Sequence, residues 1–151
     1  MLTIVNKEVS QCICCGGTRE TLMLAGKAFN LNENLEWETV WAGNQVFSSE
    51  GSFEIPGLSA DTDVQISAEA EFTLYEYDPY NNQTITNTQI RKLNDKELPV
   101  TVYGNYESYV RFTHSNNKIS FEFVPYEENY KGFVTNEVPT KVTFTSIKQR
   151  Q

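Results

Sequence analysis

The stretch Val64–Tyr77, VQISAEAEFTLYEY, alternates apolar and polar side chains almost without interruption. Apolar side chains occupy every second position from Val64 to Leu74, and polar or tyrosine side chains fill the positions between them. Successive side chains of a β-strand point to opposite faces of the sheet, so this pattern predicts a half-buried strand. Fully extended, the strand would reach about 45 Å, well beyond the usual strand length. A strand that crosses a whole domain indicates a β-sheet architecture.

Shorter alternating segments surround this strand, separated by residues that favour turns, and helical periodicity is scarce. The turn residues Asp78–Asn82 are expected to end the long strand, and Tyr106–Val124 to form a hairpin. Only Arg19–Lys27 and Asn94–Glu97 suggest a turn or a short helix. The other expected strands are Thr3–Val5, Val9–Cys15, Thr21–Leu24, Leu35–Trp41, Ser52–Ile55, Thr84–Ile90, Val100–Tyr103, Lys118–Val124 and Lys141–Ile147.

Many short alternating strands favour an all-β fold, an antiparallel β-sandwich with jelly-roll or Ig-like leanings and little helix. The length of 151 residues suits a single domain over residues 1–151, in which residues 1–30 could form an extended arm. The aromatic share of 13% supplies enough large side chains for a core. The expected core residues are Trp37, Ile66, Phe72, Leu74, Val110, Phe112, Phe121, Phe123, Val142 and Phe144.

The segment Ser52–Ala68, SFEIPGLSADTDVQISA, resembles the strand–turn–strand passage of fibronectin type III and related Ig-like sandwiches. The resemblance implies that Leu58 is the buried leucine of that turn. Val64 departs from the pattern, because those domains usually carry a tyrosine there. The resemblance supports a sandwich and carries no function to this chain, since one fold serves many functions.

The formal net charge of −8 is unevenly distributed, with three basic and eleven acidic side chains in residues 1–75 and nine of each in residues 76–151. An acidic field repels phosphate, so nucleic acid is not an expected partner. The chain has no run of eighteen apolar residues and no signal-peptide pattern, so no membrane contact is expected. Synthesis in a cytoplasm follows as the expectation.

Two groups of side chains could in principle bind metal. Cys12, Cys14 and Cys15 could join His114 around zinc, but strand alternation sends Cys15 to the face opposite the other two cysteines. Buried cysteines acting as small apolar side chains are the simpler interpretation. Asp61 and Asp63 lie in an acidic stretch without the spacing of a calcium loop. We therefore expect no metal and no cofactor.

The tyrosines form the more informative set, because all of them lie between Tyr75 and Tyr130. Tyr75 and Tyr77 are expected on the face opposite the apolar stripe of the long strand, and Tyr109 on the face opposite Val110 and Phe112. Tyrosine combines an apolar ring with a polar tip and is enriched at interfaces. These rings could contact another subunit, stack on sugars, or be covered by a second layer of the same domain.

A tryptophan pair offers a second candidate site. Trp37 and Trp41 are four residues apart on one expected strand face, about 13 Å along it, a spacing at which rings could stack on a carbohydrate. Both rings could instead belong to the core, since Leu35 shares that face. The candidate binding residues are therefore Tyr75, Tyr77, Tyr109 and Trp41.

No nucleophile, base and orienting group occur together in a recognisable motif, which predicts that the chain is not an enzyme. A β-rich chain with abundant Asn, Thr and Tyr is similar in style to the small β-sandwich proteins of bacteriophage virions, namely head-decoration, head-fibre and tail or baseplate accessory proteins. We expect a structural virion protein that binds other protein subunits, as a homo-oligomer or beside particle neighbours. The alternative is a carbohydrate-binding β-sandwich module.

Overall fold

The computed structural model describes residues 21–24, 27–30, 36–130 and 132–150. The chain divides into two units, residues 1–36 and residues 37–151. In the first unit, β1 (Thr21–Leu24) and β2 (Lys27–Asn30) pair as an antiparallel hairpin. This confirms the strand expected at Thr21–Leu24, so the turn or short helix suggested over Arg19–Lys27 is wrong for the described residues of that range. The strands expected at Thr3–Val5 and Val9–Cys15 lie outside the described residues, and an arm over residues 1–30 stays a prediction.

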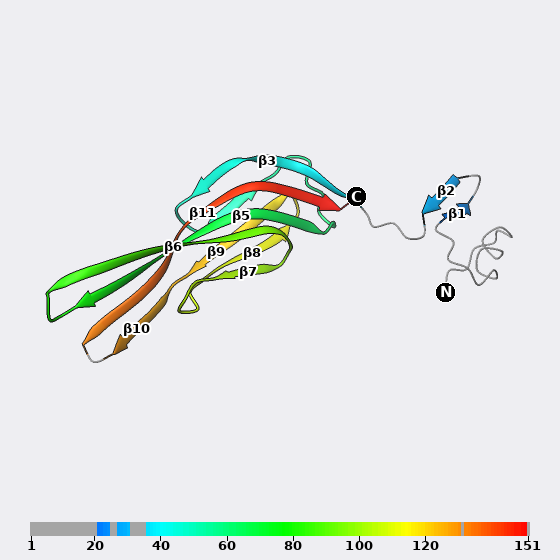
Figure 1. Ribbon diagram of the computed structural model, residues 1–151. Helices are drawn as coiled ribbons and strands as arrows, with labels where there is room; N and C mark the ends of the chain where they lie inside the picture. Colours follow the sequence, from blue (N-terminus) through cyan, green and yellow to red (C-terminus); the bar gives the residue numbers. More distant parts are fainter. Residues whose placement is uncertain (1–20, 25–26, 31–35, 131, 151) are drawn as a thin grey trace, which may run out of the picture. The chain divides into compact units, whose positions relative to one another are not determined.

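The second unit consists of two antiparallel sheets packed face to face, as Figure 1 shows. In the first sheet the long strands β5 (Val64–Asp78) and β11 (Phe133–Arg150) pair along most of their length, and β6 (Gln83–Glu97) follows β5. The other side of β11 pairs with β10 (Tyr126–Tyr130) and, further along, with β3 (Trp37–Phe47). The second sheet has the order β4 (Gly51–Glu54), β9 (Lys118–Val124), β8 (Tyr109–Ser115) and β7 (Val100–Tyr103). The expected all-β antiparallel sandwich is confirmed, and no helix occurs among the described residues.

The core lies between the two sheets and is built on the alternation of β5, whose side chains from Val64 to Phe72 are buried at every second position. Phe144 of β11 occupies its centre, where its ring contacts those of Phe47, Phe53, Phe112 and Phe121. The expected core is confirmed for Ile66, Phe72, Val110, Phe112, Phe121, Val142 and Phe144. Trp37, Leu74 and Phe123 are only half-buried.

The turn predictions are confirmed where side chains support the turn locally. Asp78 begins the β5–β6 turn, where its Oδ1 accepts the Tyr80 N–H at 2.9 Å, and Asn82 takes the left-handed conformation with φ 50°. Asn116, with φ 53°, forms the tip of the β8–β9 hairpin. Leu58 is buried, as the resemblance to Ig-like sandwiches implied, and its N–H donates to the Ile55 carbonyl at 3.1 Å.

Several strands are longer than the sequence pattern predicted. The turn or short helix expected at Asn94–Glu97 is wrong, because β6 continues through these residues with Asp95 at φ 49° and a register shift against β5. β10 was not expected, and β11 begins well before Lys141. As a result the first sheet continues past the second as two adjacent hairpins, β5–β6 and β10–β11 (Figure 1). We call residues 73–88, 126–130 and 132–138 the distal extension.

Candidate protein-binding surface

Tyr75 and Tyr77 lie on the outer face of the distal extension, the face that points away from the core. The structure leaves them 40% and 37% exposed, on the side of β5 opposite Phe72. Tyr75 is paired across the sheet with Asn136 of β11 and with Thr86 of β6. Cross-strand partners share a face, so these side chains form one continuous surface.

We call this surface the distal face. It is formed by alternate residues of three neighbouring strands, and their cross-strand registers place them side by side. None of these side chains carries a charge, although the next strand, β10, places Glu127 opposite Asn136 on the same side of the sheet. Threonine and tyrosine supply hydroxyl groups, and the tyrosine rings and two valines supply apolar area. The distal face comprises Thr73, Tyr75 and Tyr77 of β5, Thr84, Thr86 and Thr88 of β6, and Val134, Asn136 and Val138 of β11.

The rest of the outer face of the same sheet has a different character, because ion pairs cross it from strand to strand. These pairs join Lys92 to Glu69 at 3.0 Å, Lys141 to Glu71 at 2.9 Å, Lys148 to Asp95 at 3.0 Å, and Arg150 to Asp63 at 3.2 Å and Glu97 at 2.9 Å. The ion pair with Lys148 also lowers the pKa of Asp95. Exposed ion pairs add little stability, but they keep a surface hydrated. No ion pair among the described residues crosses the distal face, and one carboxylate borders it, because Glu127 of β10 lies opposite Asn136 and accepts its side-chain amide at 3.3 Å.

Aromatic side chains join the two turns at the tip of the extension. The Tyr80 ring, which is 86% exposed, lies 5.7 Å from the Phe133 ring of the neighbouring hairpin, measured between centroids. The Tyr77 hydroxyl donates to Asn82 Oδ1 at 2.6 Å. The Asn81 side-chain amide donates to Asp78 and lowers the pKa of that carboxyl. These contacts give the tip a defined shape before any partner binds, which reduces the entropy lost on binding.

A buried carboxylate holds the root of the extension against the second sheet. Glu137 is only 2% exposed and accepts the backbone N–H groups of Asn105, at 2.9 Å, and Tyr106, at 2.7 Å, from the β7–β8 loop. The Tyr106 ring stacks on Tyr126 of β10 at 5.8 Å. The hydrogen bond from the Tyr126 hydroxyl to Glu128 raises the pKa of Tyr126. The loop is therefore attached to both strands of the β10–β11 hairpin.

The structure does not bring Trp41 and Trp37 together as the sequence pattern predicted. Trp37 pairs with Arg150 and Trp41 with Ile147, and these β11 residues lie on opposite faces. The register shift leaves Val40 as an extra residue of β3, a β-bulge that turns one tryptophan over. Trp41 packs edge-on against Phe53 of the core at 5.0 Å, whereas Trp37 lies 4.8 Å from the Arg150 guanidinium. The two rings therefore do not form a common platform, and Trp41 instead packs against the core, as the alternative interpretation held.

Tyr109 does not belong to the distal face either, since β8 lies in the other sheet. It points away from the core, as predicted, and its ring packs 5.8 Å from Tyr103 and 5.2 Å from the Arg111 guanidinium. The structure thus brings together two of the predicted binding residues, Tyr75 and Tyr77, and separates Tyr109 and Trp41 from them.

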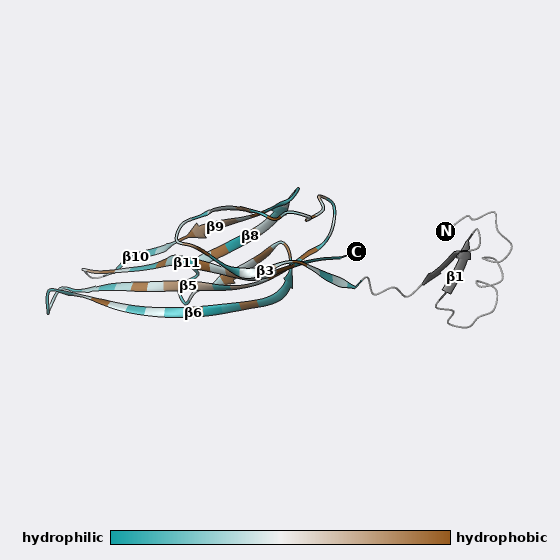
Figure 2. Cartoon of the chain, turned by 90° about the horizontal axis from the view of Figure 1, so that it is seen from above, coloured by the Kyte–Doolittle hydropathy of each residue, from teal (hydrophilic) through white to brown (hydrophobic). Residues whose placement is uncertain are grey.

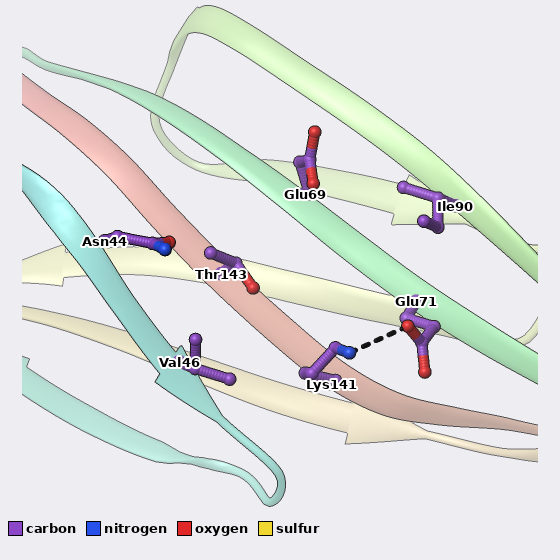
Figure 3. Close-up of a pocket in the computed structure, with 7 residues that line it drawn as sticks. All are labelled: Asn44, Val46, Glu69, Glu71, Ile90, Lys141 and Thr143. Carbon is purple, nitrogen blue, oxygen red and sulfur yellow. Dashed lines mark ion pairs between the residues drawn. The ribbon is translucent and has the colours of Figure 1, made fainter.

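A polar depression on the outer face, drawn in Figure 3, has a volume of about 270 Å³. Its only basic side chain, Lys141, is already paired with Glu71. The other lining residues are Asn44, Val46, Glu69, Ile90 and Thr143. A second depression contains Asp63 and His114, but Asp63 is paired with Arg150, and His114 Nε2 is hydrogen-bonded to the Asn116 carbonyl at 2.5 Å.

The described residues offer no cluster of side chains that could bind a metal ion. Within residues 21–24, 27–30, 36–130 and 132–150, no three His, Cys, Asp or Glu side chains converge on one point. Asp61 is exposed, and its neighbour Asp63 is engaged with Arg150. Cys12, Cys14 and Cys15 lie outside the described residues.

Comparison of the chain with protein-family models, with curated proteins and with solved structures gives no match. Among the described residues, no helix has the length and apolar character needed to cross a membrane. The functional argument therefore depends on the distal extension itself. Its threonines were missed from the sequence, although Thr84, Thr86 and Thr88 alternate in the same way as the tyrosines they adjoin.

Proposed function

We propose that this chain is a non-enzymatic structural protein that joins a larger assembly through its distal extension. The observation that carries the proposal is the distal face, whose own side chains are uncharged and include two exposed tyrosines, on a chain of net charge −8; Glu127 borders this face. Depletion of charge and enrichment in tyrosine are typical of the centre of protein interfaces. We assign the assembly to a bacteriophage virion, with the chain as a head-decoration, head-fibre or tail or baseplate accessory protein, because a small Asn-, Thr- and Tyr-rich sandwich is similar in style to those proteins.

The shape of the extension supports a role in binding a neighbouring subunit rather than in stabilising the fold of the chain itself. Its strands leave the two-layer body, so side chains on both faces beyond the root, such as Ile85 and Val134, are exposed. A single sheet with apolar side chains on both faces gains little from its own packing, and strands of this kind are usually stabilised by a further layer. A neighbouring subunit would supply that layer.

Carbohydrate binding is the second candidate function, and Tyr75 and Tyr77 are the observation that still favours it. The tryptophans do not support that hypothesis, because Trp37 and Trp41 lie on opposite faces of β3 and cannot stack on one sugar chain together. Two tyrosines on alternate positions of one strand could still present their rings to a sugar.

The test measures the size of the full-length chain in solution by light scattering over a range of concentrations. We expect oligomers whose population rises with concentration, and we expect the Tyr75→Ser/Tyr77→Ser variant to associate more weakly. The matched control is Tyr103→Ser, which removes a tyrosine ring exposed on the other sheet. A chain that stays monomeric at the highest concentration and binds no particle would overturn the proposal. Glycan-array binding that is lost in the double variant but kept in the control would favour the carbohydrate function.

A further inference from the structure

The strand β6 forms a long edge of the first sheet. Among the described residues it pairs with β5 on one side and has no strand on the other. Figure 2 shows β6 running along the border of the sheet from the body to the tip. Residues Gln83–Thr88 are all exposed, as expected for an edge that belongs to a single layer. Such an edge presents unpaired N–H and C=O groups that can hydrogen-bond to a further strand.

The other edge strands of the described sandwich have features that hinder pairing with a further strand, and most of β6 lacks these features. β4 and β7 have four residues each, β10 contains Glu127 and Glu128, and β3 is interrupted by two register shifts. Short length, charge and bulges are the usual devices that prevent strands from pairing at an edge. In β6 these devices appear only beyond Ile90, where Arg91, Lys92, Lys96 and the left-handed Asp95 occur. The segment Gln83–Ile90 contains no charge, no proline and no bulge.

We propose that β6 pairs in antiparallel orientation with β6 of a second copy of this chain, about a twofold axis at Asn87. This inference rests on the proposed assembly function and names the partner. In this register Gln83 lies opposite Arg91 of the second copy, and each Thr86 lies opposite a Thr88. The pairing joins the two long sheets into one continuous sheet. It places the same residues of both copies at the contact, as a twofold interface requires.

The side chains brought together by this register are compatible with one another. Thr86 with Thr88 and Thr84 with Ile90 are the cross-strand pairs on the distal face, and threonine pairs stabilise sheets through hydrogen bonding. On the inner face Ile85 lies opposite Gln89, and Asn87 lies opposite its own copy, where two amides can hydrogen-bond to each other.

Charge explains why a second copy would approach at this segment. Two chains of net charge −8 repel each other, so their contact is favoured where neither carries a like charge. The only charged side chain in the paired segment is Arg91, which lies opposite the neutral Gln83. A register centred two residues later, at Gln89, would bring more of the charged end of β6 into the contact, with Arg91 opposite Asn87 and Lys92 opposite Thr86.

Disulfide trapping tests the register in the full-length chain, after Cys12, Cys14 and Cys15 have been replaced by serine. In the proposed pairing the two copies of residue 87 face each other at about 4.5–5.5 Å between Cα atoms, which is within disulfide range. The two copies of residue 85, on the same face, are displaced by about 13 Å and cannot be bridged. We expect mild oxidation to convert most of the Asn87→Cys chain to a covalent dimer and to leave the Ile85→Cys control mostly uncrosslinked.

A charge series tests the same register without cysteine. Thr86→Lys/Thr88→Lys places like charges opposite each other twice and is expected to weaken the dimer roughly tenfold. Thr86→Lys/Thr88→Glu makes both cross-strand pairs attractive and is expected to restore association. Tryptophan fluorescence verifies that each variant is folded, because both tryptophans lie in β3, on the opposite side of the sheet.

The outcomes separate this inference from the proposed function. Oligomers that weaken in the Tyr75→Ser/Tyr77→Ser variant but show equal crosslinking at residues 85 and 87 would overturn the β6 pairing and leave the assembly function standing. A wild-type chain that is monomeric and binds no particle, together with an Asn87→Cys chain that does not crosslink, would overturn both.

Discussion

Replacing Glu137 by alanine is expected to loosen the root of the distal extension. The carboxylate is buried and accepts two backbone N–H groups from the β7–β8 loop. A hydrogen bond to a charged group contributes roughly 1.5–3 kcal/mol, and a buried N–H left without a partner loses roughly 1–3 kcal/mol. Asn105 and Tyr106 themselves are exposed, so water can replace part of the lost acceptor. We expect the free energy of unfolding to fall by about 2–4 kcal/mol.

Urea unfolding followed by tryptophan fluorescence measures this change, since the only two tryptophans, Trp37 and Trp41, report on the sandwich unit. The matched control is Glu127→Ala on β10, an exposed glutamate that is expected to change stability by less than about 0.5 kcal/mol. Glu137→Gln keeps one acceptor oxygen and should fall between wild type and Glu137→Ala. If Glu137→Ala proved as stable as the Glu127 control, the carboxylate would not hold the loop and this reasoning would be refuted.

Three further predictions concern the body of the sandwich. The ion pair with Lys148 depresses the pKa of folded Asp95, so its contribution is present above the unfolded pKa near 3.8 and is lost as the pH falls through the lower folded value. Asp95→Asn should therefore lose less stability than wild type between pH 5 and pH 2, as measured by urea midpoints at each pH. Gly104→Ala should destabilise by about 1–3 kcal/mol, because the added Cβ would lie 2.5 Å from a carboxylate oxygen, whereas Gly51→Ala, with its nearest atom at 3.7 Å, should be nearly neutral in the same assay. Phe144→Ala should cost about 3–5 kcal/mol in urea unfolding, and a loss below about 1 kcal/mol would contradict its central place in the core.

The sequence predicted those parts of the fold that depend on local residue patterns alone. The alternation of Val64–Tyr77 correctly separated the buried side of β5 from the side that carries Tyr75 and Tyr77. The turn at Asp78 was predictable because an aspartate side chain accepts nearby N–H groups without help from the rest of the protein.

The parts that the sequence did not predict depend on distant partners. β10, with the sequence YEENY, shows no apolar alternation and is a strand because β11 pairs with it. The alternation rule placed Trp37 and Trp41 on one face, but the bulge at Val40 arises from the register against β11. Glu137 was not recognised, since its two donors come from a loop far away in the sequence.

Hydrogen exchange at low and high protein concentration tests the central claim most directly, namely that the distal extension is where this protein meets another. At high concentration we predict slower exchange of the backbone amides of residues 73–88, 126–130 and 132–138, with unchanged exchange in β4, β8 and β9. Exchange in the extension that does not depend on concentration, or protection gained only in the second sheet, would contradict the account.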